Sequence, residues 1–140
     1  FIELMRTGDN QAFFERQHVS GSLLRDWLLA RGWVPAVRGA DDGPAVEFHH
    51  TDYAGRIGLI APYAPGFCDG CNRLRVNARG QLRLCLFGRG GRDLRDLLAS
   101  DDQKAALQRR IVDAMQFKPP SHALHLGDAG DTRNLAQTGG

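Results

Sequence analysis

The stretch FCDGCNRLRVNARGQLRLCLFG, residues 67–88, holds every cysteine of the chain and two runs in which apolar and polar residues alternate. A loop at Ala78–Gly80 with a left-handed glycine would fold these runs into an antiparallel hairpin. One face then holds Leu74, Val76, Leu82, Leu84 and Leu86, and a slip of one residue would mix the two faces. The predicted polar face pairs Asn77 with Gln81, Arg75 with Arg83, and Arg73 with Cys85.

The cysteines follow the pattern C-x2-C-x13-C, so Cys68 and Cys71 lie in a glycine-containing turn and Cys85 lies on a nearby strand. The thiols could be small buried apolar groups. With His49 or His50 they could complete a Cys3His zinc site. They could also hold a [4Fe–4S] cluster with one iron open to a ligand. The arginines of the hairpin favour an anionic ligand, but the spacing alone does not choose between zinc and iron.

The composition is that of an ordinary globular protein, because 42% of the 140 residues are hydrophobic and 24% are charged. A net charge of +2 is too small to indicate nucleic-acid binding by itself. No apolar run approaches the roughly 20 residues of a membrane span, and no secretory signal is present. An odd cysteine count without a signal predicts a cytoplasmic protein with a metal site. The apolar opening FIELM, without an initiator methionine, indicates a fragment of a longer protein.

The hydrophobic pattern predicts α+β architecture, with antiparallel strands flanked by helices. The segment GRGGR, residues 88–92, lacks the lysine and hydroxyl of a P-loop and is weak evidence for a nucleotide. Expected strands cover residues 1–5, 34–37, 45–50, 56–62, 73–76 and 81–87. Expected helices cover residues 20–33, 93–100 and 101–116.

Several segments together are specific enough to carry a resemblance. They are FIELM with TGDN, DYAGRIGLIAPY, FCDGCNRLRV, LCLFG, LRDLL and the terminal Gly-Gly. With these segments the chain resembles, over its whole length, the C-terminal part of the GTP 3′,8-cyclase family. These are radical S-adenosylmethionine enzymes of molybdenum cofactor biosynthesis. The resemblance therefore implies an enzyme whose substrate is GTP.

The resemblance also implies a fold and a cluster. Residues 1–19 would end an incomplete, TIM-like α/β barrel, and residues 20–140 would form the substrate and second-cluster domain with a flexible Gly-Gly tail. Cys68, Cys71 and Cys85 match the family's ligands of a second [4Fe–4S] cluster, whose open iron binds GTP.

Other site residues also come from the resemblance. Arg73, Leu74 and Arg75 match the GTP-binding segment, and Met5 matches a position near S-adenosylmethionine. Gly139 and Gly140 match a tail that enters the active site, although Thr138 replaces the family's usual bulky apolar residue. The arginines and the two glycines are the predicted catalytic residues.

This chain has no C-x3-C-x2-C motif, which holds the family's first [4Fe–4S] cluster. Cleavage of S-adenosylmethionine would therefore require a missing N-terminal radical domain, and the chain alone is predicted to be inactive. A homodimer is one option, and no nucleic acid or membrane partner is expected. The rival interpretation is a zinc-ribbon-like module that binds nucleic acid through its arginines, and a plain scaffold with buried thiols is the third.

Overall fold

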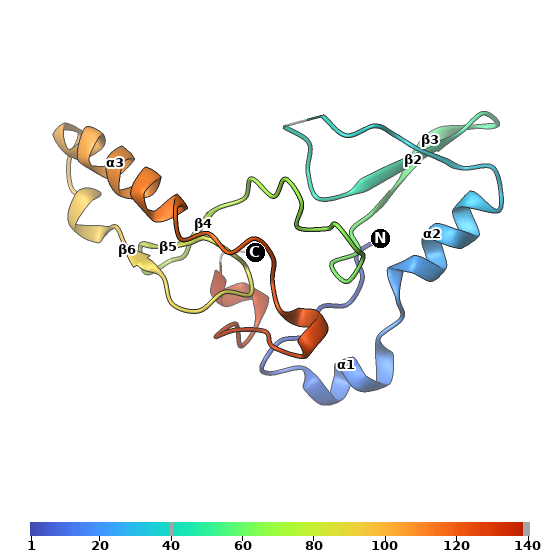
Figure 1. The fold of residues 1–140 in the computed structure, drawn as a ribbon, viewed down its shortest axis with the longest axis horizontal. Helices are drawn as coiled ribbons and strands as arrows, with labels where there is room; N and C mark the ends of the chain where they lie inside the picture. Colours follow the sequence, from blue (N-terminus) through green and yellow to red (C-terminus); the bar gives the residue numbers. More distant parts are fainter. Residues whose placement is uncertain (40, 139–140) are drawn as a thin grey trace. The chain divides into compact units, whose positions relative to one another are not determined.

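The structure is a computed structural model that describes residues 1–39 and 41–138 (Figure 1). The chain forms two compact units. The first unit comprises Phe1–Met5 and Ala12–Cys71, and the second unit comprises Arg6–Gln11 and Asn72–Gly140. A three-stranded antiparallel sheet lies in each unit, so the predicted α+β class is confirmed.

Two helices precede the first sheet. Helix α1, Gln11–Gln17, was not predicted, whereas α2, Gly21–Leu29, lies inside the predicted helix. Ser20 is the N-cap of α2, and its hydroxyl accepts a hydrogen bond from the backbone N–H of Ser22 at 3.3 Å. Leu28 is fully buried and Leu24 packs against the same core, whereas Leu23 and Trp27 of α2 are exposed.

The first sheet has the order β1-β2-β3. Its strands are β1, Val34–Pro35, β2, Val46–His50, and β3, Tyr53–Leu59. Phe48 and Leu59 pack with Leu28 of α2 in one core. The predicted buried strand at residues 1–5 is reduced to a single parallel bridge between Ile2 and Ile60, and Ile2 is exposed.

The second sheet has the order β4-β5-β6, with much shorter strands. These are β4, Arg75–Val76, β5, Gln81–Arg83, and β6, Arg92–Asp93. Leu82 of β5 packs with Leu94 and with Ala114 of helix α3, Lys104–Met115. The predicted helix at 93–100 is wrong: Asp93 pairs with Gln81, and only the 3-10 turn η1 follows. The 3-10 turns are η1, Arg95–Leu97, η2, Asp101–Gln103, η3, Leu124–Leu126, and η4, Leu135–Thr138.

Within residues 1–39 and 41–138, no helix has the length and apolar content needed to cross a membrane.

Candidate functional site

The C-x2-C pair lies in a tight turn of the first unit. The backbone N–H of Cys71 donates to the carbonyl of Cys68 at 3.0 Å. Gly66 and Gly70, on either side of Cys68, have φ values of +74° and +67°, in the left-handed region that favours glycine. The two left-handed glycines therefore allow the consecutive turns that contain both thiols.

The hairpin keeps the predicted register near its loop, but β5 ends at Arg83, so the predicted strand to residue 87 is wrong and the ladder does not reach the predicted pair of Arg73 and Cys85. Arg75 pairs with Arg83, and the N–H of Asn77 donates to the carbonyl of Gln81 at 3.1 Å. Gly80 has a φ of +69°, as the predicted loop requires. The predicted apolar face is confirmed in part, because Leu82 is buried in the core of the second unit and Leu74 and Leu84 pack against it, whereas Val76 is exposed.

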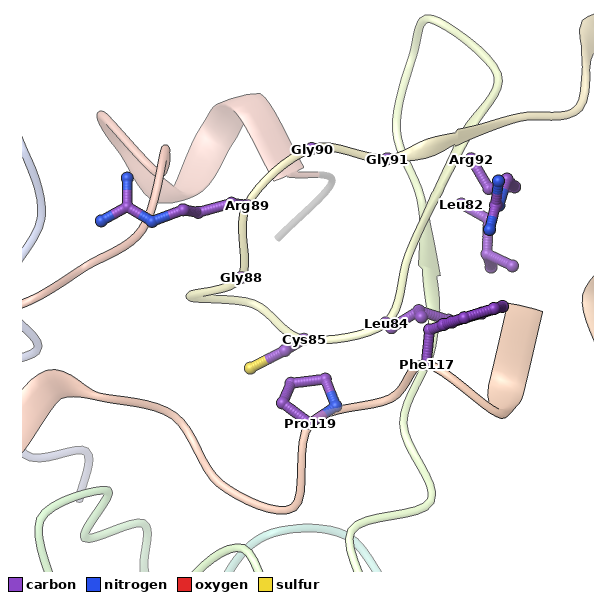
Figure 2. Close-up of a pocket in the computed structure, with 10 residues that line it drawn as sticks. All are labelled: Leu82, Leu84, Cys85, Gly88, Arg89, Gly90, Gly91, Arg92, Phe117 and Pro119. Carbon is purple, nitrogen blue, oxygen red and sulfur yellow. The ribbon is translucent and has the colours of Figure 1, made fainter.

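Cys85 lies beside a pocket of about 400 Å³ in the second unit. Figure 2 shows residues 85–91 tracing an arc, with the side chain of Arg89 pointing away from it. The guanidinium of Arg92 lies 5.5 Å from the ring of Phe117. The segment GRGGR, residues 88–92, which lacks the P-loop lysine and hydroxyl, thus forms part of a pocket wall next to a cysteine. The pocket is lined by Leu82, Leu84, Cys85, Gly88, Arg89, Gly90, Gly91, Arg92, Phe117 and Pro119.

A buried arginine holds the Cys85 loop against the C-terminal segment. Arg83 is only 9% exposed, and its Nη2 donates to Asp131 Oδ1 at 2.5 Å and to the carbonyl of Gly88 at 3.0 Å. It also donates to the hydroxyl of Thr132 at 3.3 Å. The other carboxylate oxygen of Asp131 accepts from the backbone N–H of Gly90 at 2.6 Å. One acid therefore contacts both the buried arginine and the glycine-rich segment.

The backbones also meet closely in this region. A Cβ on Gly130 would lie 2.4 Å from the carbonyl oxygen of Gly88, so only glycine fits there. Arg89 pairs with both carboxylate oxygens of Asp128, at 2.8 and 3.0 Å. Thr132 donates its hydroxyl hydrogen to the carbonyl of Leu86 at 2.5 Å. These contacts fix the segment after Cys85.

Hydrogen bonding keeps the two acids of this region ionised. Partial burial acts to raise the pKa of Asp131, but the hydrogen bonds from Arg83 and from the Gly90 backbone outweigh it, and the pKa lies below its ordinary value. The pKa of Asp128 is also lowered, first by the backbone N–H of Gly130 and then by its arginine partner. The ion pairs therefore persist across the neutral range.

The histidine proposed as a zinc ligand is already engaged within the first unit. The backbone N–H of Asp52 donates to His50 Nδ1 at 3.0 Å. Nε2 of the neutral ring must then carry the proton, and it donates to the carbonyl of Arg31 at 3.0 Å. A metal bond to His50 would break one of these contacts, while His49 is exposed. A zinc site that used His50 would therefore require one of these hydrogen bonds to break.

The three thiols are chemically able to ligate either an iron–sulfur cluster or zinc. All three cysteines are half-buried reduced thiols, and thiolates are the ligands of both iron–sulfur clusters and structural zinc. Cys68 and Cys71 belong to the first unit, and Cys85 belongs to the second. Across the part of the chain that the structure describes, no group of three or more His, Cys, Asp or Glu residues is gathered as a metal site.

The remaining predicted residues are distributed between the two units. Met5 lies in the first unit, whereas Arg73, Leu74 and Arg75 lie in the second and are half-buried. Gly139 and Gly140 lie outside the described residues. The sequence reasoning missed Arg83 as a buried anchor, although its place on the polar face opposite Arg75 was predicted.

Sequence reasoning also missed two other buried or half-buried polar groups. Glu3 is buried in the first unit and contacts His18 Nε2 at 2.8 Å. Lys118 of the second unit reaches two backbone carbonyls. The burial of Glu3 could have been predicted, because it is an acidic residue inside the apolar run FIELM. For Lys118, the adjacent Pro119 and Pro120 marked a helix end but not a buried contact.

Comparison with known proteins gives a consistent result. The family model described as Molybdenum Cofactor Synthesis C matches residues 1–124. The chain is 56% identical over 140 residues to a GTP 3′,8-cyclase of Klebsiella pneumoniae, covering all of this chain and 43% of that protein. It is 55% identical to one of Haemophilus influenzae and 56% identical to one of Pasteurella multocida, covering all of this chain and 42% of each. The chain thus spans less than half the length of these relatives.

Proposed function

The chain belongs to the Molybdenum Cofactor Synthesis C family, and from that premise we propose that it is the C-terminal part of a GTP 3′,8-cyclase. The full protein would be a cytoplasmic radical S-adenosylmethionine enzyme that cyclises GTP in molybdenum cofactor biosynthesis. The observation that supports this proposal is the hairpin register, which pairs Arg75 with Arg83 and leaves Arg73 and Cys85 on the two arms, each two residues beyond that last pair.

We propose that Cys68, Cys71 and Cys85 hold a [4Fe–4S] cluster as three thiolates. Such a cluster supplies one iron with an open coordination position for a ligand such as a purine base. The two arginines of β4 and its approach are half-buried, and their guanidinium groups suit bidentate bonds to the triphosphate. Leu74 packs on the apolar core, so its contact with GTP would come from the main chain.

The rest of the catalytic machinery would lie on an N-terminal radical domain with its own [4Fe–4S] cluster. In this proposal residues 1–19 end an incomplete α/β barrel, and residues 20–140 form the substrate and second-cluster domain. Met5 would lie near S-adenosylmethionine at the end of that barrel. The chain alone would then bind the second cluster without catalysing the reaction, and a homodimer of the full protein is compatible with this arrangement.

Metal content tests the cluster directly. Anaerobic reconstitution of the chain with iron and sulfide should give about four irons and a brown chromophore, as one cubane cluster requires. Cys85→Ser should abolish the stable cluster, because one thiolate is lost. Stoichiometric zinc without the chromophore would instead support the zinc-ribbon-like module, and nucleic-acid binding could then be measured on the same sample.

Kinetics of the full-length enzyme tests the arginine role. Arg73→Ala should raise the KM for GTP by about tenfold or more while iron content is unchanged, because it removes a charge-assisted phosphate contact. Arg79→Ala is the matched control, since Arg79 is exposed in the loop of the same hairpin. Wild-type kinetics in Arg73→Ala would contradict this assignment.

The terminal glycines are proposed to position the substrate or the radical. Glycine has no side chain, so its backbone can approach a ligand closely. Gly140→Ala and deletion of Gly139 with Gly140 should reduce GTP cyclisation in the full-length enzyme while cleavage of S-adenosylmethionine continues. Full cyclisation after the deletion would show that the tail is dispensable.

A further inference from the structure

Lys118 is a half-buried cation that joins the two arms of the hairpin. It follows helix α3, and its ammonium Nζ donates to the carbonyl of Arg73 at 3.0 Å and to the carbonyl of Leu84 at 2.5 Å. These carbonyls belong to the two different arms, one before β4 and one after β5. A single side chain from outside the sheet therefore bridges both arms of the hairpin.

The bridge lies where the regular strand pairing ends. The ladder runs from Val76↔Leu82 to Arg75↔Arg83. If the same register continued, Arg73 would face Cys85, and the two residues would exchange backbone hydrogen bonds. In the structure the carbonyl of Arg73 accepts a hydrogen bond from the ammonium of Lys118. The lysine therefore helps to set the distance between the two arms beyond the pair of Arg75 and Arg83. An ammonium carries three donors and can serve two carbonyls at once.

The backbone around Lys118 is well anchored. Ala114 of α3 is buried in the core of the second unit, and Ile111 packs against the same core. The Pro119 ring restricts the backbone of Lys118 to extended conformations. The neighbours Phe117 and Pro119 line the same pocket as Cys85. The lysine is therefore held in place from its helix as well as by its two hydrogen bonds.

A purely packing role does not explain this placement. Lysine usually extends its charged end into water while its methylenes cover apolar surface. Here the ammonium is directed to two main-chain carbonyls, one belonging to Arg73 and the other to the residue just before Cys85. A charged donor makes stronger hydrogen bonds than a neutral one, so it holds these two carbonyls at a set separation.

We infer that Lys118 is a positioning residue that sets the spacing between the GTP-binding segment at Arg73 and the cluster ligand Cys85. This inference rests on the proposed function of those two residues. Lys118 itself touches neither substrate nor cluster in this scheme and acts through the main chain of both arms. Its loss should therefore affect GTP binding and the cluster environment more than the fold.

The test is made in the full-length enzyme with Lys118→Met, which keeps the length and removes the donors. We expect the KM for GTP to rise by about 10- to 100-fold, since displacements near 1 Å can cost that much. Lys118→Arg keeps a cation with several donors and should recover most of the lost affinity. The control is Lys104→Met, because Lys104 is the only other lysine and is exposed at the start of α3.

A second measurement distinguishes a positioning role of Lys118 from a general loss of stability in the variant. The electron paramagnetic resonance spectrum of the reduced second cluster should change in Lys118→Met before GTP is added, because the arm that carries Cys85 shifts. If Lys118→Met does not fold, Lys118→Gln replaces it; this shorter, uncharged side chain cannot bridge both carbonyls, and a several-fold rise in KM is expected. A lowered melting temperature with unchanged KM and spectrum would overturn the inference.

The proposed function and the inference fail in different ways. If Arg73→Ala raises the KM for GTP while Lys118→Met and Lys118→Gln leave it at the wild-type value, the inference alone is overturned. If Arg73→Ala also shows the wild-type KM, the proposed role of Arg73 falls, and the inference falls with it.

Discussion

The two units of this chain stabilise their sheets in different ways. In the first unit, strands of five and seven residues pair over most of their length, and Phe48 and Leu59 pack on Leu28 beneath them. In the second unit, the strands have only two or three residues. Here Lys118 and Arg83 donate to backbone carbonyls just beyond the paired residues.

The difference shows how side-chain hydrogen bonds can fix segments that lie outside regular strands. Buried backbone carbonyls need hydrogen-bond partners, and a strand supplies them only while its ladder continues. Where the ladder is short, long cationic side chains take over this role. Loops held by a few such contacts can carry binding residues at defined positions, which suits the half-buried arginines and Cys85.

The largest expected effect concerns the hydrophobic core of the first unit. Phe48→Ala should lower the free energy of unfolding of the first unit by about 3–5 kcal/mol, because it removes a fully buried aromatic ring and leaves a cavity. Urea unfolding followed by tryptophan fluorescence measures it, since both tryptophans, Trp27 and Trp33, lie in the first unit.

Val37→Ala is the control for this measurement. Val37 is 98% exposed, so its truncation should change the free energy of unfolding very little. Equal losses in Phe48→Ala and Val37→Ala would contradict the assignment of the core.

The next largest effect concerns the hydrogen bonds of the buried Arg83 in the second unit. Arg83→Met should destabilise the second unit by about 1–3 kcal/mol, because the acceptors around Arg83 lose their donor. Hydrogen exchange should accelerate over residues 85–91 and 128–133, while the tryptophan signal of the first unit is unchanged. Arg109→Met is the control, since this arginine is exposed on α3. Uniform acceleration across both units would argue against a local role.

A smaller effect concerns the hairpin loop. Gly80→Ala should cost about 1–2 kcal/mol, because a left-handed backbone is strained for any residue with a Cβ. That Cβ would also lie 2.6 Å from the Cγ of Arg95, whose flexible side chain must move. Gly55→Ala in β3 is the comparison, since its Cβ meets no heavy atom within 4 Å. Thermal unfolding should show a loss for the first variant and none for the second.

The smallest expected effect is a pH dependence of the second unit. The hydrogen bonds from the side chain and backbone of Arg95 lower the pKa of Asp93 from 3.8 to about 2. A lowered pKa stabilises the folded state above the unfolded value, so this contribution is complete above about pH 4 and disappears as the pH falls toward 2. Because the pair is exposed, the gain is small and screened by salt.

Asp93→Asn isolates this contribution. The variant should show a shallower loss of stability between pH 4 and pH 2 than the wild type, and a carbon NMR titration of the Asp93 carboxyl should give the lowered pKa directly. An ordinary pKa in that titration would remove the basis of the prediction.

The hairpin could be predicted from the sequence because the residues that determine it are close neighbours in the chain. The alternation of apolar and polar residues assigns each side chain to one face of the hairpin. Gly80 marks the left-handed position of its loop, and together these two features predict the register. Helices α2 and α3 were also predicted, since their apolar spacing and the Ser20 cap lie within the segments themselves. The C-x2-C turn followed from its glycines.

Other features were misread because distant contacts decide them. Helix α1 has little apolar periodicity, and Phe14 on it stacks on His18 with ring centres 4.4 Å apart and lies 5.8 Å from Tyr63. The segment after residue 92 looks helical, but pairing of Arg92 and Asp93 with β5 draws it into the sheet. The expected buried strand at residues 1–5 instead forms a single bridge at Ile2, with backbone hydrogen bonds between Phe1 or Glu3 and residues 58–60.

The sequence by itself determined the α+β class and the hairpin register at Arg75 and Arg83, because backbone periodicity and glycine conformations are local properties. Only the tertiary structure decided that Lys118 satisfies the carbonyls of Arg73 and Leu84 and that Arg83 anchors Asp131. These partners lie 34 to 48 residues apart. A carbonyl can accept from any donor that the fold brings within reach, so no local pattern in the sequence specifies which residue provides it.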